Sequence, residues 1–318
     1  MGPAHRTYPA RDAPTACALL VSNRVRTWLS LQVLSALLLP GIVEAQGILL
    51  LAHGGRDNWN QEVLAVADRI DSTRPVEVAF GMANKRTIQD AVDRLVERDV
   101  SHIVAVPLFI SSHSSVLRAT EYLLGARDDP PPQLEAFARM GAGRGAGQAG
   151  SDSGFDWTSP VETTVPIAVR SALDSHAVVA EILVSRALDI SRSPEEEVVV
   201  LVAHGPSSEE DNAHWLDNMR VLAEKMGHTR FSRIEHLTVR DDASEPVQEQ
   251  ATAELRAVVE GAVGEGRSVL VVPLLLSYGG IEAGIRERLE GLAYRMADQA
   301  LLPDERLSQW VLMQASGQ

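Results

Sequence analysis

The chain has 318 residues, a formal net charge of −14 and 45% hydrophobic residues. So acidic a chain lacks the basic face that nucleic-acid binding requires, and we expect no nucleic-acid partner. The length and apolar content suffice for two cores of ordinary domain size. Cys17 is the only cysteine, so no disulfide within the chain is expected.

The first 45 residues are predicted to be a secretory signal peptide. Arg24 and Arg26 precede an uncharged apolar stretch at 28–43, and residues 43–45 (VEA) match a small-residue cleavage pattern. The stretch is short for a membrane span, which needs about 20 residues. We expect an exported, periplasmic or extracellular protein without a stable membrane span after cleavage. An uncleaved anchor is one alternative, and a cytoplasmic protein is another if translation starts later.

A short apolar run followed by Ala-His-Gly occurs twice, at Gly47–Gly55 (GILLLAHGG) and Val198–Pro206 (VVVLVAHGP). Neither run alternates between apolar and polar residues, which is typical of a strand buried on both faces of a parallel sheet. Open α/β sheets bind ligands at the carboxyl ends of their parallel strands. His53 and His204, which follow the two runs, are therefore candidate site residues.

The rest of the first half alternates between strand and helix patterns, which predicts a right-handed parallel α/β unit. Further strands are expected at 75–80, 102–110 and 163–169, and helices at 57–71, 87–98, 115–125 and 174–189. Between them, residues 126–160 contain three consecutive prolines and a Gly-rich run at 141–154. This composition predicts a flexible surface insertion without a packed element.

The second half repeats the order, after a linker at 191–197. Strands are expected at 197–203, 233–239 and 268–276, and helices at 209–226 and 245–263. We predict an α/β protein of two parallel-sheet domains, 46–192 and 193–318, related by a pseudo-two-fold axis. Aligning Pro107 with Pro273 places His113 opposite Gly279, so the second half has lost one of the two histidines.

His53 and His113 follow the first and third strands of the first half. Neighbouring parallel strands lie about 4.8 Å apart, so the two imidazoles can converge on one divalent metal ion. A neutral imidazole can also accept a proton near neutral pH. His204 is a weaker candidate because its partner position is Gly279. Five other histidines, all after the predicted signal peptide, are assigned surface or packing roles: His102, His176, His214, His228 and His236.

Other chemistries have little support in the sequence. The serines around His113 are compatible with a hydrolase, but no G-x-S-x-G elbow is present. Neither half has the G-x-G-x-x-G of a dinucleotide fold after one of its predicted strands, since the matching string at 145–150 (GAGQAG) belongs to the Gly-rich run. No G-K-[ST] sequence occurs either, so no nucleotide cofactor is expected.

The order LLLAHGG, PVEVAF, VAVPLFISSHSS, then VLVAHGP and VVPLLLSYGG, resembles the CbiX/SirB-type class II chelatases, the sirohydrochlorin cobaltochelatases and ferrochelatases. The resemblance spans residues 47–310 apart from the Gly-rich insertion. It implies two flavodoxin-like domains with a cleft between them, in which a divalent metal is inserted into a tetrapyrrole. Cobalt, iron and nickel all suit a pair of imidazoles, and the metal is a substrate.

By this resemblance, His53 and His113 are the catalytic residues and the metal ligands, and one of them also takes a pyrrole proton. The implied substrate-binding residues line the macrocycle: Gly54, Leu108, Phe109, Ile110, Ser111 and Ser112. Where the family carries a glutamate shortly after the second strand, this chain has Met82. The alternative function is an exported protein that binds a metal or tetrapyrrole without turnover. The sequence leaves the oligomeric state open.

Overall fold

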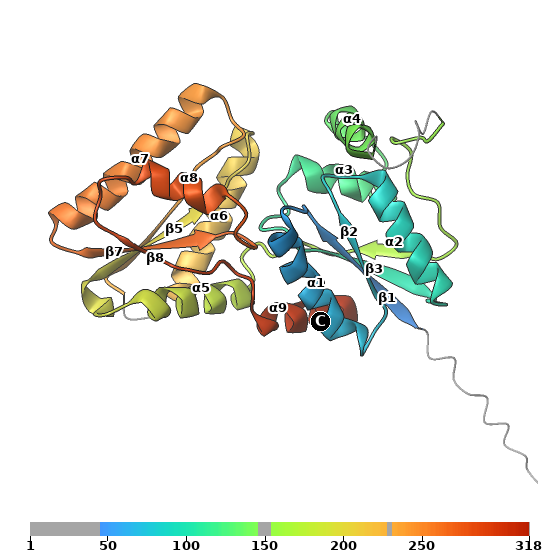
Figure 1. Cartoon of the computed structure of the whole chain (residues 1–318), viewed down its shortest axis with the longest axis horizontal. Coiled ribbons are helices and arrows are strands. Elements are labelled where there is room, and N and C mark those ends of the chain that lie inside the picture. Colours follow the sequence, from blue (N-terminus) through green and yellow to red (C-terminus); the bar gives the residue numbers. More distant parts are fainter. Residues whose placement is uncertain (1–44, 146–153, 228–230, 318) are drawn as a thin grey trace, which may run out of the picture. The chain divides into compact units, whose positions relative to one another are not determined.

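The computed structural model describes residues 45–145, 154–227 and 231–317 (Figure 1). Residues 1–44 of the predicted signal peptide lie outside this range. The described chain forms two four-stranded parallel sheets with flanking helices, which confirms the predicted α/β class. Among the helices of these residues, none is long and apolar enough to cross a membrane.

The two sheets have the same strand order, β2-β1-β3-β4 and β6-β5-β7-β8. Their strands are β1 (Gln46–Ala52), β2 (Val76–Phe80), β3 (His102–Pro107), β4 (Ile167–Val169), β5 (Glu197–Ala203), β6 (Arg233–Thr238), β7 (Ser268–Leu274) and β8 (Arg295–Met296). The helices are α1 (Asp57–Asp71), α2 (Lys85–Glu97), α3 (Ser115–Leu123), α4 (Leu134–Gly145), α5 (Ala177–Ile190), α6 (Glu209–Met226), α7 (Glu245–Gly264), α8 (Ile281–Arg288) and α9 (Glu305–Ser316), with a 3₁₀ turn at Pro194–Glu196.

The apolar runs form the central strands of the two sheets, as their composition predicts. Residues 48–52 of β1 and all of β5 are buried. In the first sheet Leu51 pairs with Pro107, and in the second Val202 pairs with Pro273. The strand registers are therefore equivalent, which confirms the alignment that sets His113 opposite Gly279.

Two helices are exchanged between the halves. Helix α5 follows the first sheet in the chain but packs on α6 and β7, whereas α9, at the end of the chain, packs on α1 and β3 (Figure 1). One hydrophobic cluster consequently runs through both halves and includes Leu183 of α5 and Trp310 of α9. Burying such faces is the main stabilising contribution to folding, so each half depends on a helix supplied by the other.

The expectation that residues 126–160 lack a packed element is wrong. Helix α4 buries Leu134, Phe137 and Ala138, whose i, i+3, i+4 spacing gives it an apolar face. Gly141 lies within this helix, and a Cβ there would come within 3.0 Å of the Trp157 ring. The glycine therefore permits close packing at that point, an effect that composition alone does not reveal.

Strands β3 and β7 end three and two residues earlier than predicted, at Pro107 and Leu274. The apolar residues beyond them bond instead to the chain that follows the fourth strand. Leu173 N donates to Phe109 O at 3.0 Å, and Leu301 N donates to Leu275 O at 3.0 Å. In both halves, therefore, the residues just after the third strand leave the sheet and lead into the loop that carries His113 or Gly279.

Candidate metal site

His53 lies directly after β1, with its side chain exposed at the sheet edge. Its ring centroid is 5.1 Å from that of Phe109, and the ring planes are tilted by 54°. The turn continues through Gly54, whose φ of +76° lies in the left-handed region that glycine adopts at little cost. The end of β1 thus presents an imidazole held against one aromatic ring.

His113 lies in the loop between β3 and α3, and Asp174 fastens that loop. The Asp174 carboxylate accepts hydrogen bonds from Ser112 N at 2.7 Å and from Ser112 Oγ at 2.6 Å. His113 N donates to Ser111 Oγ at 3.1 Å, and the His113 side chain is half-buried. The serines around His113 therefore shape the loop.

Helix α6 of the second half contacts His113 through two residues and helix α3 through a third. The His214 ring stacks on the His113 ring, with centroids 3.9 Å apart and planes 15° apart. Trp215 Nε1 donates to His113 O at 2.8 Å. Asp211 accepts two hydrogen bonds of 2.8 Å from the Arg118 guanidinium.

The Arg118–Asp211 pair is a bidentate ion pair with a buried carboxylate. The hydrogen bonds from Arg118 hold the pKa of the Asp211 carboxyl below its usual range, and the same bonds raise the pKa of Arg118. The carboxylate thus stays ionised near neutral pH and ties α3 to α6.

The predicted macrocycle-lining segment divides into buried and partly exposed positions. Leu108, Phe109 and Ser111 are buried, and Phe109 belongs to the core cluster of the first sheet. Ile110 and Ser112 are half-exposed. The structure thus leaves these two side chains, together with backbone, accessible to a ligand. The substrate-binding role of the segment stays a prediction.

The two histidines are connected through one short segment, since Phe109 contacts the His53 ring and His113 follows four residues later. Across residues 45–145, 154–227 and 231–317, no cluster of three or more His, Cys, Asp or Glu side chains could hold a metal ion. The described residues therefore add no third protein ligand to the predicted pair, His53 and His113. A resident metal usually has three or four protein ligands, whereas two leave most positions open for exchange.

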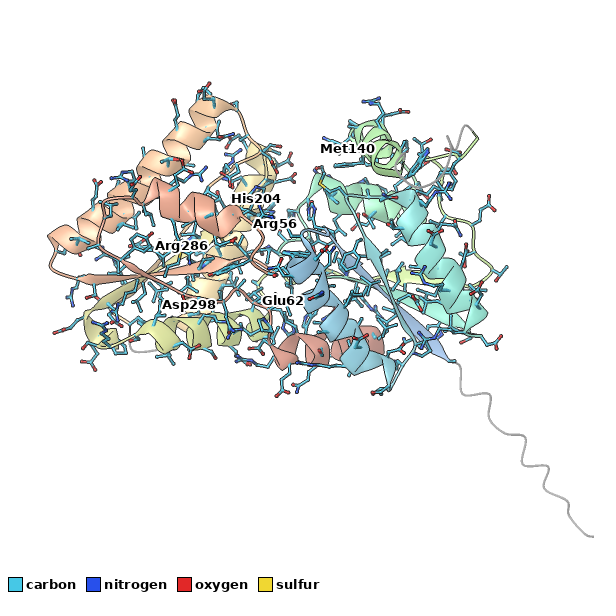
Figure 2. All side chains as sticks on the ribbon, viewed as in Figure 1. Arg56, Glu62, Met140, His204, Arg286 and Asp298 are labelled. Carbon is cyan, nitrogen blue, oxygen red and sulfur yellow. The ribbon has the colours of Figure 1, made fainter. Side chains whose placement is uncertain are left out.

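The second half keeps the strand-end histidine in a different setting. His204 Nε2 lies 3.6 Å from Asp242 Oδ2 (His204 is labelled in Figure 2). The buried Arg240 wraps the same turn: its guanidinium donates to Pro206 O at 3.0 Å and to Ser207 O at 2.8 Å. At the position equivalent to His113, Gly279 packs against Trp59, where a Cβ would come within 3.2 Å of Cδ1.

Sequence reasoning missed three contributors, namely Asp174, Asp211 and His214. Asp174 had no recognisable signal, because its partner Ser112 is far away in the chain. His214 was assigned a surface or packing role; its spacing of three and four residues from Asp211 and Asn218 places all three on one helix face. Met82, at the position of the family glutamate, packs partly buried against the core cluster of the first sheet.

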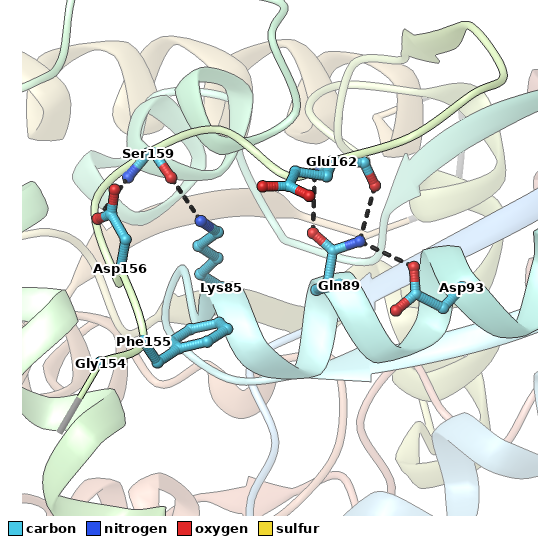
Figure 3. Close-up of a pocket in the computed structure, with 8 residues that line it drawn as sticks. All are labelled: Lys85, Gln89, Asp93, Gly154, Phe155, Asp156, Ser159 and Glu162. Atoms are coloured by element: carbon cyan, nitrogen blue, oxygen red, sulfur yellow. Dashed lines mark hydrogen bonds between the residues drawn. The ribbon is translucent and has the colours of Figure 1, made fainter. Parts of the chain in front are cut away.

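A pocket of about 480 Å³ lies elsewhere, between α2 and residues 154–162 (Figure 3). Its walls are hydrogen-bonded to each other: Lys85 Nζ donates to Ser159 Oγ at 2.5 Å, and Gln89 bonds the backbone of Glu162 in both directions. Neither His53 nor His113 lines it. These bonds show that the end of the predicted flexible insertion is packed onto α2.

Residues 47–190 match the CbiX family model. The structure is similar to that of SirB from Bacillus subtilis with Fe³⁺, with a TM-score of 0.55 and 17% identity over 85% of this chain and 94% of that chain. It is also similar to a multi-domain protein from Deinococcus radiodurans that is described as structurally similar to chelatases. There the TM-score is 0.51 and the identity 17%, over 86% of this chain and 55% of that chain. These likenesses extend the shared fold over both halves. No curated protein sequence matches the chain.

Proposed function

We propose that the chain, whose residues 47–190 match the CbiX family model, inserts cobalt(II) or iron(II) into a sirohydrochlorin-type tetrapyrrole. The observation that carries this proposal is the placement of two accessible imidazoles. His53 follows β1 and His113 follows β3, and these strands are neighbours in one sheet. Both histidines lie at the carboxyl edge, where open α/β sheets bind ligands.

In this reaction a divalent metal replaces two pyrrole N–H protons. His53 and His113 hold the incoming metal through neutral ring nitrogens, and the remaining coordination positions stay open to water and to the macrocycle. As the pyrrole nitrogens take over the metal, an imidazole that has released it can accept one pyrrole proton. The second proton passes to solvent. Two weakly constraining ligands suit a metal that must be handed over.

The test is anaerobic mixing of the protein with sirohydrochlorin and cobalt(II), followed through the absorption spectrum of the pigment. Conversion faster than in a protein-free control, and lost in His113→Ala, is the expected result. A pigment converted no faster than in the control contradicts the proposed activity. Repeating the assay with iron(II) and nickel(II) ranks the metals by rate.

A second candidate function is binding of a metal or metallated tetrapyrrole without turnover. Met82 favours it, because an apolar side chain packed against the core supplies no carboxylate for metal or proton transfer. Export, predicted from the first 45 residues, is part of this second proposal. The same assay separates the two functions, since a bound but unconverted pigment supports binding alone.

A further inference from the structure

Four residues of α6 face the His113 loop and the residue that fastens it. Asp211, His214, Trp215 and Asn218 have the i, i+3, i+4, i+7 spacing of one helix face. Three of them contact Arg118 or His113, and Asn218 Nδ2 donates to Asp174 Oδ1 at 3.2 Å. One face of helix α6, which belongs to the second half, thus contacts both His113 and Asp174.

These contacts restrict His113 at two levels. The bond from Trp215 Nε1 fixes the His113 carbonyl, and the stacked His214 ring limits rotation of the His113 side chain. Freezing a side chain on binding costs conformational entropy, so a ring already held in place binds a ligand more tightly. His53 stands against Phe109 in a comparable way, but that ring comes from its own half.

The stacked geometry also excludes His214 as a second ligand of an ion bound to His113. A metal bound to imidazole lies in the ring plane, about 2.0–2.1 Å from the nitrogen. The rings of His113 and His214 are 15° from parallel, with centroids 3.9 Å apart. Two such planes cannot both contain an ion at that distance from each ring. In this arrangement His214 offers His113 an aromatic face, while the nitrogen edges of His113 remain outside the stack.

We propose that His214 is a positioning residue of the metal site, which holds the His113 ring in its ligating orientation by stacking on it. This inference rests on the proposed function in one respect, the role of His113 as a metal ligand. It assigns the second half a part in the site although its own histidine pair is incomplete. The stacking itself does not depend on metal.

The test is calorimetric titration of the full protein with cobalt(II) alone, in the wild type and three variants. We expect His214→Ala to weaken binding about tenfold, the low end of the effect of residues that orient a ligand. His214→Phe keeps an aromatic face and should bind close to the wild-type value. His102→Ala is the matched control, since it removes a histidine from the opposite end of β3 and should change nothing.

Equal affinity in His214→Ala and the wild type overturns the inference. So does a His214→Phe variant that is as weak as His214→Ala, since that result makes the ring nitrogens of His214 essential. If the wild type binds no cobalt, the proposed function has failed, and a metal-free measurement decides the inference by itself.

That measurement is the NMR signal of the His113 Cε1 proton, assigned by its absence in His113→Ala. A stacked aromatic face shifts the signal upfield. The shift should disappear in His214→Ala and return in His214→Phe. A signal that is unchanged in His214→Ala overturns the inference whatever the metal affinity.

Discussion

The two halves share a strand order and a strand-end histidine, but they differ at the residue that supports the loop after the third strand. In the first half Asp174 bonds Ser112 and so fastens the His113 loop. In the second half the equivalent position is Leu302, buried in the shared hydrophobic cluster. The loop there carries Gly279 in place of a histidine. The first half thus has both Asp174 and His113, whereas the second half has Leu302 and Gly279 at the equivalent positions.

The turn after the second strand shows the same contrast. Phe80 pairs with Ala52 and Thr238 with Ala203, so Met82 and Arg240 occupy equivalent positions two residues later. Met82 packs beside the core, whereas Arg240 donates to the backbone of the His204 turn. The Arg240 guanidinium also donates to Glu209 Oε1 at 2.7 Å, so hydrogen bonds and an ion pair fill this turn in the second half. The second half therefore has the same strand scaffold but a different set of contacts at this turn.

The largest effect is expected for the strand-end histidines themselves. His53→Ala and His113→Ala should each weaken cobalt(II) binding more than about a hundredfold, since losing even an orienting residue costs 10–100-fold. His204→Ala should leave the affinity nearly unchanged. Calorimetric titration measures all three. Equal affinities in the three variants and the wild type would show that the two halves do not differ in metal binding.

The first residues of the two central strands offer a second contrast, Glu197 in β5 against Gln46 in β1. Glu197 is buried, which would raise the pKa of its carboxyl, but hydrogen bonds from Ser191, Arg192 N and Arg295 outweigh the burial and lower that pKa. A folded-state pKa below the unfolded value stabilises the fold above the ordinary glutamate pKa. The stabilisation is lost as the pH falls through the folded-state value.

Glu197→Gln should therefore lower the free energy of unfolding by about 3–5 kcal/mol at pH 7, because it breaks a buried ion pair. The difference from the wild type should start to shrink below pH 4.5, the ordinary pKa of a glutamate carboxyl. Urea denaturation at pH 7 and at pH 3 measures both. Gln46→Ala is the control and should cost about 1 kcal/mol at either pH, since Gln46 makes hydrogen bonds as a neutral side chain. A pH-independent loss in Glu197→Gln would refute the electrostatic explanation.

The glycines that follow His53 and His204 also differ between the halves, in the space available to a side chain. Both have positive φ, +76° at Gly54 and +73° at Gly205. A Cβ at Gly205 would come within 2.5 Å of Thr238 Cβ, whereas at Gly54 the nearest atom, Phe80 Cβ, would be 3.3 Å away. Gly205→Ala should cost about 3 kcal/mol and Gly54→Ala about 1 kcal/mol, from left-handed strain plus overpacking. Thermal unfolding of both variants tests the order; a larger loss in Gly54→Ala would reverse it.

Local pattern was sufficient for the elements that carry their own signal. The helices predicted at 57–71 and 209–226 have those bounds, because apolar spacing and the polar residues at their ends are read within one segment. The strand at 197–203 likewise matches, and the register of the third strand in each half follows from the repeated proline. The repeat, more than any single motif, placed His53 and His113 on neighbouring strands.

Most features that the sequence did not predict are contacts between residues far apart in the chain. Helices α8 and α9 were not predicted, and neither was the exchange of α5 and α9, since an apolar helix face does not specify which sheet it covers. The contact between His214 and His113 joins residues about a hundred positions apart. Helix α4 was missed for another reason: its glycines outweighed the short apolar face that buries Leu134 and Phe137.

The position of α9 has a consequence for the order in which the protein is made. Helix α9 covers α1 and β3, which are synthesised well before it, since the whole second sheet lies between them in the chain. Its Trp310 and Leu307 are buried in the shared core, and Gln46 at the start of β1 donates to Ala315 O at 2.8 Å. Throughout synthesis of the second half, that face of the first sheet therefore has α1 but lacks α9. Apolar surface exposed on a nascent chain is prone to aggregation, which is why chaperones exist. A chain that stopped before residue 305 would keep both candidate ligands but permanently lack α9.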